Sequence, residues 1–376
     1  MRILQVSAFP SSEAGGSQTY SHELSRRLAR RHEVHLLTSR LNTLTGQRRT
    51  RNGLHIHEAP SPATLFHTPL TVALPYLLQE AFDLLHVHSY VFLTSTQSAL
   101  AARLRKIPFL LHLHGGLEPA TPDSPSPVKG LYLRKRLFDL TAGRLTVRAA
   151  QAIASVSRRD IRLASQLFDL DLEVFHWIPN AVNSSLLKRG WKGENLERMT
   201  YVGRLEPWKG TIDLLKISRA LLKRRPNVEI LVAGKGSMTG DVQREAAKSD
   251  GRMCYLGQVQ PNQIPRLLEE STLLILPSYI EGVPTVALEA MAVGTPTVLS
   301  RVGGTPEIVK HGVTGFLFEV GDSRGCVELV DGLLDDRSSL RSVTSKAKKV
   351  VEKWHTWERV VLKVESLYKA LSELRK

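Results

Sequence analysis

The sequence predicts an α/β fold made of two doubly wound, Rossmann-like domains that face each other across a cleft. The chain of 376 residues is long enough for about two domains of roughly 150 residues each. Its composition, 42% hydrophobic and 23% charged, is typical of a globular protein with material for two cores. Short apolar runs alternate with amphipathic stretches in both halves of the chain. Strand, helix and strand repeated in this way build a parallel sheet with helices on both faces.

The expected elements follow from these apolar runs. In the first half, strands are expected over 3–7, 34–38, 54–57, 84–88, 109–114 and 152–156. Helices between them are expected over 19–31, 94–105, 131–148 and 158–168. In the second half, strands are expected over 200–202, 229–233, 253–256, 273–277, 297–300 and 315–318. Pro179-Asn180 interrupts the pattern, so we expect domains over 1–177 and 178–353, followed by a last helical segment over 354–376.

The two cysteines and the lengths of the apolar segments bear on where in the cell the protein is expected. Cys254 and Cys326 have neither the number of a disulfide framework nor the spacing of a metal site. The apolar run after Arg2 ends within a few residues, and no segment approaches the length of a membrane span. We therefore expect a cytoplasmic protein.

The formal net charge of +15 favours anionic partners, and one segment carries much of it. Between Lys129 and Arg162, nine basic residues stand against two acidic ones. Leucines alternate with these cations, as on a helix that lies on a membrane surface. A solvated helix face explains such charge runs equally well, so contact with an anionic membrane is one of two open interpretations.

The densest motif is the segment 201–210, in which a strand ends at Gly203 and a helix opens after Gly210. Arg204 and Lys209, on the loop between them, can converge on a phosphate at the edge of the sheet. A second strand runs into Gly234, where either a tight turn or a close ligand would explain the glycine. A helix beginning near Ser17, after the first strand, would offer backbone amides to an anion.

The segment 273–292 contains a buried strand, then Glu281 on a loop, then a helix that opens near Pro284 or Thr285 and contains Glu289. Eight residues of helix span about 12 Å. That exceeds the roughly 5 to 9.5 Å between the paired carboxyl groups of glycosidases. Two such distant carboxylates fit a long ligand, with each accepting hydrogen bonds from a different sugar ring.

Together these motifs resemble those of the family-4 retaining glycosyltransferases of the GT-B fold, also called glycosyl transferases group 1. That family shows a V-G-R-L-x-x-x-K-G loop, here Val202 to Gly210, and two glutamates eight residues apart followed by A-M-A-x-G, here 281–294. It also shows P-N-G-V-D at the domain junction, here 179–183. Ala181 and Asn183 depart from that last pattern, and Val283-Pro284 stands where many relatives have Phe-Gly.

The resemblance implies a metal-independent hexosyltransferase that uses a UDP- or GDP-sugar and retains the anomeric configuration. It implies that the acceptor is a sugar or a lipid-linked sugar, in glycan, polysaccharide or glycolipid synthesis, and that the last helix crosses back to the first domain. The implied catalytic residues are His114, Glu281, Arg204 and Lys209. The implied donor-binding residues are Gly16, Arg204, Lys209, Gly234, Glu281, Gly282, Val283, Pro284, Thr285 and Glu289.

Several alternatives stay open at this stage. His86 and His88 alternate along one strand, and we expect them on opposite faces, as we do His112 and His114. Asp169-Leu170-Asp171 has the pattern of a manganese site in another glycosyltransferase fold, but we expect no metal here. A nucleotide-sugar epimerase or a phosphorylase-like enzyme would share the architecture. The basic charge alone would fit nucleic-acid binding, against which stands the lack of any recognised nucleic-acid motif.

Overall fold

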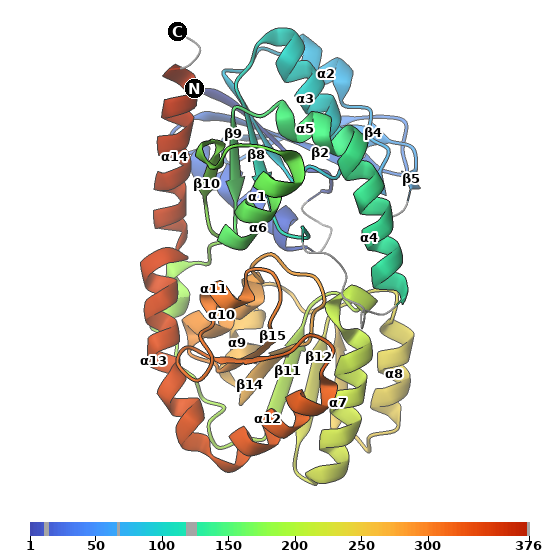
Figure 1. The fold of residues 1–376 in the computed structure, drawn as a ribbon, viewed down its shortest axis with the longest axis vertical. Helices are drawn as coiled ribbons and strands as arrows, with labels where there is room; N and C mark the ends of the chain where they lie inside the picture. The colour runs from blue at the N-terminus through green and yellow to red at the C-terminus, as the bar shows by residue number, and fades with distance from the viewer. Residues whose placement is uncertain (11–14, 66–67, 118–125, 374–376) are drawn as a thin grey trace. The chain divides into compact units, whose positions relative to one another are not determined.

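The computed structural model describes residues 1–10, 15–65, 68–117 and 126–373, and these form two compact units. The first unit combines Met1–Leu117, Leu133–Pro179 and Glu358–Lys376. The second contains Asn180–Trp357 and, among the described residues, 126–132, the first part of the helix α4 (Ser126–Phe138). Each unit has its own parallel sheet with helices packed on it (Figure 1).

The sheet of the first unit has the strand order β10-β9-β8-β7-β1-β2-β4-β3, and its pairs are parallel except for β3 with β4. Its strands are β1 (Arg2–Val6), β2 (Glu33–Leu41), β3 (Gln47–Arg51), β4 (Leu54–Ser61), β7 (Leu84–His88), β8 (Phe109–Leu113), β9 (Ala152–Ser155) and β10 (Phe175–Trp177). A separate short hairpin joins β5 (Thr64–Leu65) and β6 (Thr68–Pro69).

The helices of the first unit follow from the amphipathic stretches of the sequence. They are α1 (Gly16–Leu28), α2 (Leu74–Gln79), α3 (Leu93–Arg105), α4 (Ser126–Phe138), a π-helical turn (Asp139–Gly143), α5 (Arg144–Arg148), α6 (Arg158–Phe168), a 3-10 turn (Leu172–Val174) and α14 (Trp357–Glu373). The single helix expected over 131–148 is wrong, because the π-helical turn, with non-helical angles at Thr141, separates α4 from α5.

The two faces of the first sheet differ in chemistry. Because successive side chains of a strand point to opposite faces, Leu4, Val6, Leu85 and Val87 share one face and pack in the main apolar core. The polar Gln5 lies on the other face. There its side chain contacts Tyr368 of α14.

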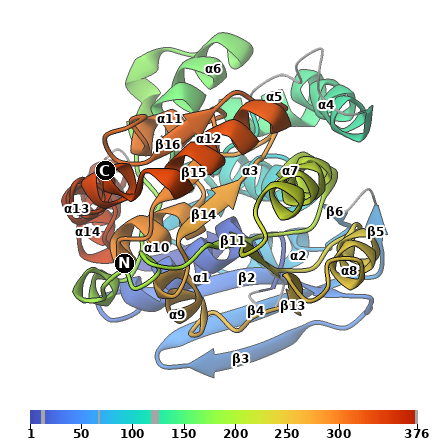
Figure 2. The same ribbon diagram turned by 90° about the horizontal axis from the view of Figure 1, so that it is seen from below.

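The sheet of the second unit is parallel throughout, in the order β13-β12-β11-β14-β15-β16. Its strands are β11 (Arg198–Val202), β12 (Glu229–Ala233), β13 (Met253–Gly257), β14 (Leu273–Leu276), β15 (Thr297–Ser300) and β16 (Phe316–Phe318). Its helices are α7 (Thr211–Arg224), α8 (Thr239–Ala247), α9 (Ile264–Glu269), α10 (Thr285–Val293), α11 (Thr305–Ile308), α12 (Ser323–Asp335) and α13 (Arg337–Trp354), with 3-10 turns at Ser184–Lys188 and Pro207–Lys209. Figure 2 shows the sheet between α7 and α12 on one face and α9 and α10 on the other.

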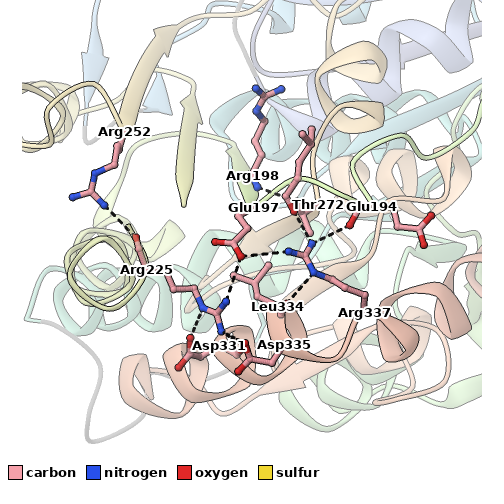
Figure 3. A network of polar contacts seen from close by, with 11 residues as sticks. Glu194, Glu197, Arg198, Arg225, Arg252, Thr272, Asp331, Leu334, Asp335 and Arg337 are labelled. Atoms are coloured by element: carbon pink, nitrogen blue, oxygen red, sulfur yellow. Dashed lines mark hydrogen bonds and ion pairs between the residues drawn. The ribbon is translucent and has the colours of Figure 1, made fainter. Parts of the chain in front are cut away.

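A polar network stabilises the edge of the second sheet at which its strands begin (Figure 3). The guanidinium of Arg225, which follows α7, binds Asp331 and Asp335 of α12 and also Glu197, directly before β11. Arg337 donates to the carbonyl oxygen of Leu196 at 2.6 Å. These contacts fix the start of β11, the strand from whose far end the motif at 203–210 emerges.

Candidate active site

The sequence motifs of the second unit meet at one point of its sheet. β11 is the first strand of that unit, and its neighbours in the sheet are β12 on one side and β14 on the other. The chain therefore reverses its direction of winding between β11 and β14. Ligands of doubly wound sheets bind at such a switch point, beyond the carboxyl ends of the strands. The loops that leave β11 and β14 there are 203–210 and 277–284.

The two loops are held against each other by backbone contacts. Gly210 has a φ of +71°, and a side chain there would place its Cβ 1.8 Å from the carbonyl oxygen of Pro277. The carbonyl oxygen of Trp208 accepts hydrogen bonds from the backbone amides of Tyr279 and Ile280, at 3.0 and 3.2 Å. Glycine at 210 thus permits the close approach that brings the basic loop to the acidic one.

This approach joins Lys209 to Glu281. The Nζ atom of Lys209 lies 2.7 Å from Oε1 of Glu281, and both side chains are largely buried. The hydroxyl of Ser278 donates to the same carboxylate oxygen at 2.9 Å. The carboxylate of Glu281 is therefore held in a fixed position at the switch point.

Arg204 lies on the same loop as Lys209 and is exposed. The carbonyl oxygen of Arg204 accepts a hydrogen bond from Tyr201 at 2.8 Å, which anchors its backbone. Its guanidinium carbon lies 6.0 Å from the centre of the Trp208 ring. Within the ranges that the structure describes, this guanidinium has no carboxylate partner, so its charge is available to an anion.

Glu289 lies in the second turn of α10, the helix that follows the acidic loop. Burial raises the pKa of Glu289 to about 7. No described side chain forms a hydrogen bond or ion pair with its carboxylate. Glu289 is half-buried, and a carboxylate that has lost water without gaining a partner is stabilised by a ligand that donates hydrogen bonds to it.

Four of the predicted donor-binding residues form the entry to α10. Gly282, Val283 and Pro284 are buried, Pro284 is the N-cap, and Thr285 is the first helical residue, as the sequence predicts. Asn180 donates its side-chain amide to the carbonyl oxygen of Val283 at 2.6 Å, which fixes this turn. The backbone amides of the first turn of α10 are then oriented as at other anion-binding helix termini.

Gly234 has a structural explanation of its own. Its φ is +141°, and a Cβ at this position would lie 1.8 Å from the carbonyl oxygen of Gly203. Packing of the loop after β12 on the loop after β11 therefore accounts for the glycine without a ligand.

In the first unit, Gly16 is the first residue of α1, and His114 directly follows β8. The expectation that His86 and His88 lie on opposite faces is wrong, because residues two apart in a strand share a face. Their rings lie 4.4 Å apart, and those of His112 and His114 lie 4.5 Å apart.

The two candidate metal sites differ in geometry. Asp169 is exposed, and Oδ2 of its carboxylate lies 3.4 Å from a guanidinium nitrogen of Arg148. In contrast, ring nitrogens of His86, His88 and His112 all lie within 4.8 Å of one another. That cluster is buried in the first unit, and the sequence analysis did not predict it.

Comparison with known proteins identifies the family. Residues 14–186 match the model of "Glycosyltransferase Family 4" and residues 187–350 that of "Glycosyl transferases group 1". The chain is 27% identical over 387 residues to N-acetyl-alpha-D-glucosaminyl L-malate synthase of Bacillus anthracis, covering 96% of this chain and 95% of that one. The chain belongs to the GT-B glycosyltransferases.

Other relatives agree with this assignment. UDP-Gal:alpha-D-GlcNAc-diphosphoundecaprenol alpha-1,3-galactosyltransferase of Escherichia coli is 26% identical over 311 residues, 78% of this chain and 76% of that one. The solved structure of Anabaena HepE in complex with UDP superposes with a TM-score of 0.77 at 19% identity, over 98% of this chain and all of that one. Sucrose-phosphate synthase from Thermosynechococcus elongatus gives 0.79 at 18% identity, over 98% of each chain.

The basic segment of this glycosyltransferase is partly engaged within its own unit. Lys135 pairs with the buried Asp139 at 2.7 Å, and Arg148 donates to the carbonyl oxygen of Phe168. The side chain of Lys129 lies outside the described residues. Large apolar side chains are nevertheless exposed on the segment: Leu133, Leu137, Leu140 and Leu145. Within the described ranges, no helix is both long and apolar enough to cross a membrane.

Two residues that support Glu281 are not among the site residues predicted from the sequence. Ser278 holds Glu281, and Gly303 lets its loop approach the backbone of Glu281, since a Cβ there would lie 1.9 Å from that carbonyl oxygen. Both follow predicted strands of the second half directly or closely. Their position at the carboxyl ends of β14 and β15 is the signal that could have identified them.

Proposed function

We propose that this glycosyltransferase moves a hexose from a nucleotide diphosphate sugar to an acceptor hydroxyl with retention of the anomeric configuration, and that it needs no metal. The observation that carries the proposal is the arrangement at the switch point of the second sheet. There, Arg204 and Lys209 lie on one loop, and Glu281 is bound to Lys209. Cations and acids placed together in this way suit a ligand with a diphosphate between two sugar rings.

The cations act on the leaving group. As the bond from the anomeric carbon to the diphosphate breaks, negative charge grows on the diphosphate and positive charge on the carbon. Arg204 and Lys209 stabilise that negative charge more in the transition state than in the bound donor. The acceptor hydroxyl attacks on the face that the diphosphate leaves and gives its proton to the departing phosphate oxygen, so that configuration is retained and no further base is required.

The acids hold the rings. Glu289 accepts hydrogen bonds from the ribose hydroxyls, which compensate the water that its carboxylate has lost. Glu281, held beside Lys209, accepts hydrogen bonds from hydroxyls of the transferred sugar. The backbone N–H groups of Gly282, Val283 and Thr285, at the start of α10, donate to phosphate or sugar oxygens. In the first unit, Gly16, at the start of α1, approaches the diphosphate, and His114 contacts the sugar near the reacting carbon.

The donor is a UDP- or GDP-sugar, with UDP favoured by the complex of the structural relative HepE. The acceptor is a sugar or a lipid-linked sugar, as in the diphosphoundecaprenol-specific relative. The exposed leucines and basic residues of the segment from Lys129 to Arg162 fit contact with an anionic membrane, on whose inner face a cytoplasmic enzyme would meet such an acceptor.

A panel of UDP-, GDP- and ADP-sugars tests the donor, with thermal stabilisation as the first readout and product formation as the second. We expect one donor class to raise the melting temperature and to support transfer in the presence of EDTA. The anomeric configuration of the product should be the same as that of the donor. The control ligands are the corresponding nucleosides, which lack phosphate. Stabilisation by none of the sugars, or activity that EDTA abolishes, would contradict the proposal.

A further inference from the structure

A chain of hydrogen bonds crosses one face of the first sheet and ends at His114. The strands β1, β7 and β8 lie side by side, and alternate residues of each point to the same face of the sheet. On this face lie Gln5 from β1, His86 and His88 from β7, His112 from β8, and His114, which directly follows β8. The last helix, α14, adds the hydroxyl of Tyr368. All of these side chains are in the first unit.

The contacts run without interruption. Nε2 of His114 lies 2.9 Å from Nδ1 of His88, and Nε2 of His88 lies 2.6 Å from Oε1 of Gln5. Nε2 of Gln5 lies 2.6 Å from the hydroxyl of Tyr368, which lies 2.6 Å from Nδ1 of His86. Nε2 of His86 lies 3.2 Å from Nδ1 of His112, and Nε2 of His112 lies 3.3 Å from the carbonyl oxygen of Ile178.

The carbonyl of Ile178 sets the direction of the first half of this chain. A carbonyl oxygen accepts and never donates, so His112 must carry its proton on Nε2. A neutral His112 then accepts at Nδ1, which makes His86 the donor from its own Nε2. His86 in turn accepts at Nδ1, from the hydroxyl of Tyr368 at 2.6 Å and, at 3.3 Å, from the amide nitrogen of Gln5.

The hydrogen-bond directions are fixed in the same way from Tyr368 to His114. Because the proton of Tyr368 is used on His86, its oxygen accepts from the amide nitrogen of Gln5. The amide oxygen of Gln5 then faces His88, which must donate to it from Nε2. A neutral His88 accepts at Nδ1, and the donor is Nε2 of His114.

These donor and acceptor roles require that the histidines are neutral, and burial favours the neutral form. His86, His88 and His112 are buried, and burial lowers the pKa of His112 to about 3. Burial and the neighbouring rings lower the pKa values of His86, His88 and His114 well below the usual range. No carboxylate of a described residue forms an ion pair with any of the four.

We propose that this hydrogen-bond chain fixes His114 as the neutral Nε2–H tautomer, and that Gln5 and Tyr368 are positioning residues for it. The lone pair of Nδ1 is then the hydrogen-bond acceptor that His114 offers to a substrate hydroxyl. The functional part of this inference rests on the proposed contact of His114 with the sugar. Through Tyr368, α14 thus positions a histidine that directly follows a strand of the sheet.

Removal of the Tyr368 hydroxyl should weaken the constraint that fixes the tautomer of His114. In Tyr368→Phe, the amide nitrogen of Gln5 loses its acceptor at 2.6 Å and keeps only the longer contact of 3.3 Å with Nδ1 of His86, so the amide is held less firmly. With its nitrogen toward His88, it would reverse the donors along His88 and His114 and place the proton of His114 on Nδ1. The matched control is Tyr90→Phe, which removes another buried hydroxyl of the first unit, bonded to Asp139 at 2.6 Å.

The test is long-range ¹H–¹⁵N NMR of the full-length protein labelled at histidine, with His114 assigned from His114→Gln. We expect the wild-type His114 signals of the neutral Nε2–H tautomer, a mixture of tautomers in Tyr368→Phe, and the wild-type pattern in Tyr90→Phe. In transfer assays, kcat of Tyr368→Phe should fall by about tenfold with little change in the KM of the donor, by the magnitude seen when partners that orient functional histidines are removed.

Each other outcome overturns a defined part. A wild-type His114 with the proton on Nδ1, or with both nitrogens protonated, overturns the hydrogen-bond chain whether or not the enzyme is a transferase. Stoichiometric binding of Zn²⁺ by His86, His88 and His112 would overturn it too, since a metal would take the same ring nitrogens. Full transfer activity of His114→Gln overturns the positioning role even where the tautomer is as expected.

Discussion

The raised pKa of Glu289 makes the stability of this protein depend on pH in a defined direction. The carboxyl has a pKa of about 7 in the folded protein, against an ordinary value of 4.5, because burial penalises its charged form. A group with a raised folded pKa stabilises the fold fully below its unfolded pKa, and that stability is lost as the pH rises through the folded value. For Glu289 the loss therefore extends from about pH 4.5 to about pH 7.

The magnitude follows from the shift. The pKa of Glu289 differs by about 2.5 between the folded and the unfolded protein, and at 1.36 kcal/mol per pH unit this corresponds to about 3 kcal/mol in the free energy of unfolding. Most of it, about 2 to 3 kcal/mol, falls between pH 5 and pH 8. Glu289→Gln has the same shape and no charge, so it removes this dependence.

The measurement is chemical denaturation of the wild type and Glu289→Gln at pH 5 and pH 8. The free energy of unfolding of the variant should gain on that of the wild type by about 2 to 3 kcal/mol over this range. Glu270→Gln is the control, since Glu270 is an exposed carboxylate in the same unit. Parallel pH profiles for wild type and Glu289→Gln would refute the reasoning.

Three further predictions address the loops, the polar network and the basic segment. Gly210→Ala should destabilise the second unit by about 1 to 3 kcal/mol in thermal unfolding, because it combines a positive φ with a Cβ contact at Pro277, and an unchanged melting temperature would contradict this. Arg225→Ala should lower the melting temperature and leave donor affinity unchanged, since it breaks the network of Figure 3 at the edge of the sheet away from the site, and a selective loss of donor binding would be inconsistent with that placement. Replacing Leu133 and Leu137 by Gln should weaken sedimentation with anionic vesicles more than Leu362→Gln, an equally exposed leucine on α14, and equal binding of the two variants would argue against a membrane contact of this segment.

Much of the fold could be predicted because its strands are apolar and buried. The runs at 84–88, 229–233 and 297–300 became strands with those bounds. β3 (Gln47–Arg51) was missed because it is an edge strand whose five residues are all exposed and polar, so its sequence has no hydrophobic pattern. The strand β10 was missed because three residues are too few for a period, and its segment was interpreted as part of the domain boundary.

The site was predictable in its residues and less so in its contacts. Glycines beside charged residues, at the ends of predicted strands, indicated the loops at 203–210 and 281–285. The sequence could not reveal that Lys209 binds Glu281, since that pair depends on the strand order that makes β11 and β14 neighbours. The histidine cluster was missed because the faces of β7 and β8 were assigned wrongly, and because the contribution of Tyr368 comes from a helix 282 residues away from His86.

The central claim is that Arg204 and Lys209 bind the diphosphate of the donor. Calorimetric titration of the wild type and Arg204→Ala with the nucleoside diphosphate of the preferred donor, and with the corresponding nucleoside, tests it most directly. Arg244→Ala, an exposed arginine on α8, is the matched control. We predict that Arg204→Ala weakens diphosphate binding at least tenfold and reduces kcat by about 10² to 10³, with nucleoside binding unchanged. Equal losses for diphosphate and nucleoside, or no loss at all, would contradict the account.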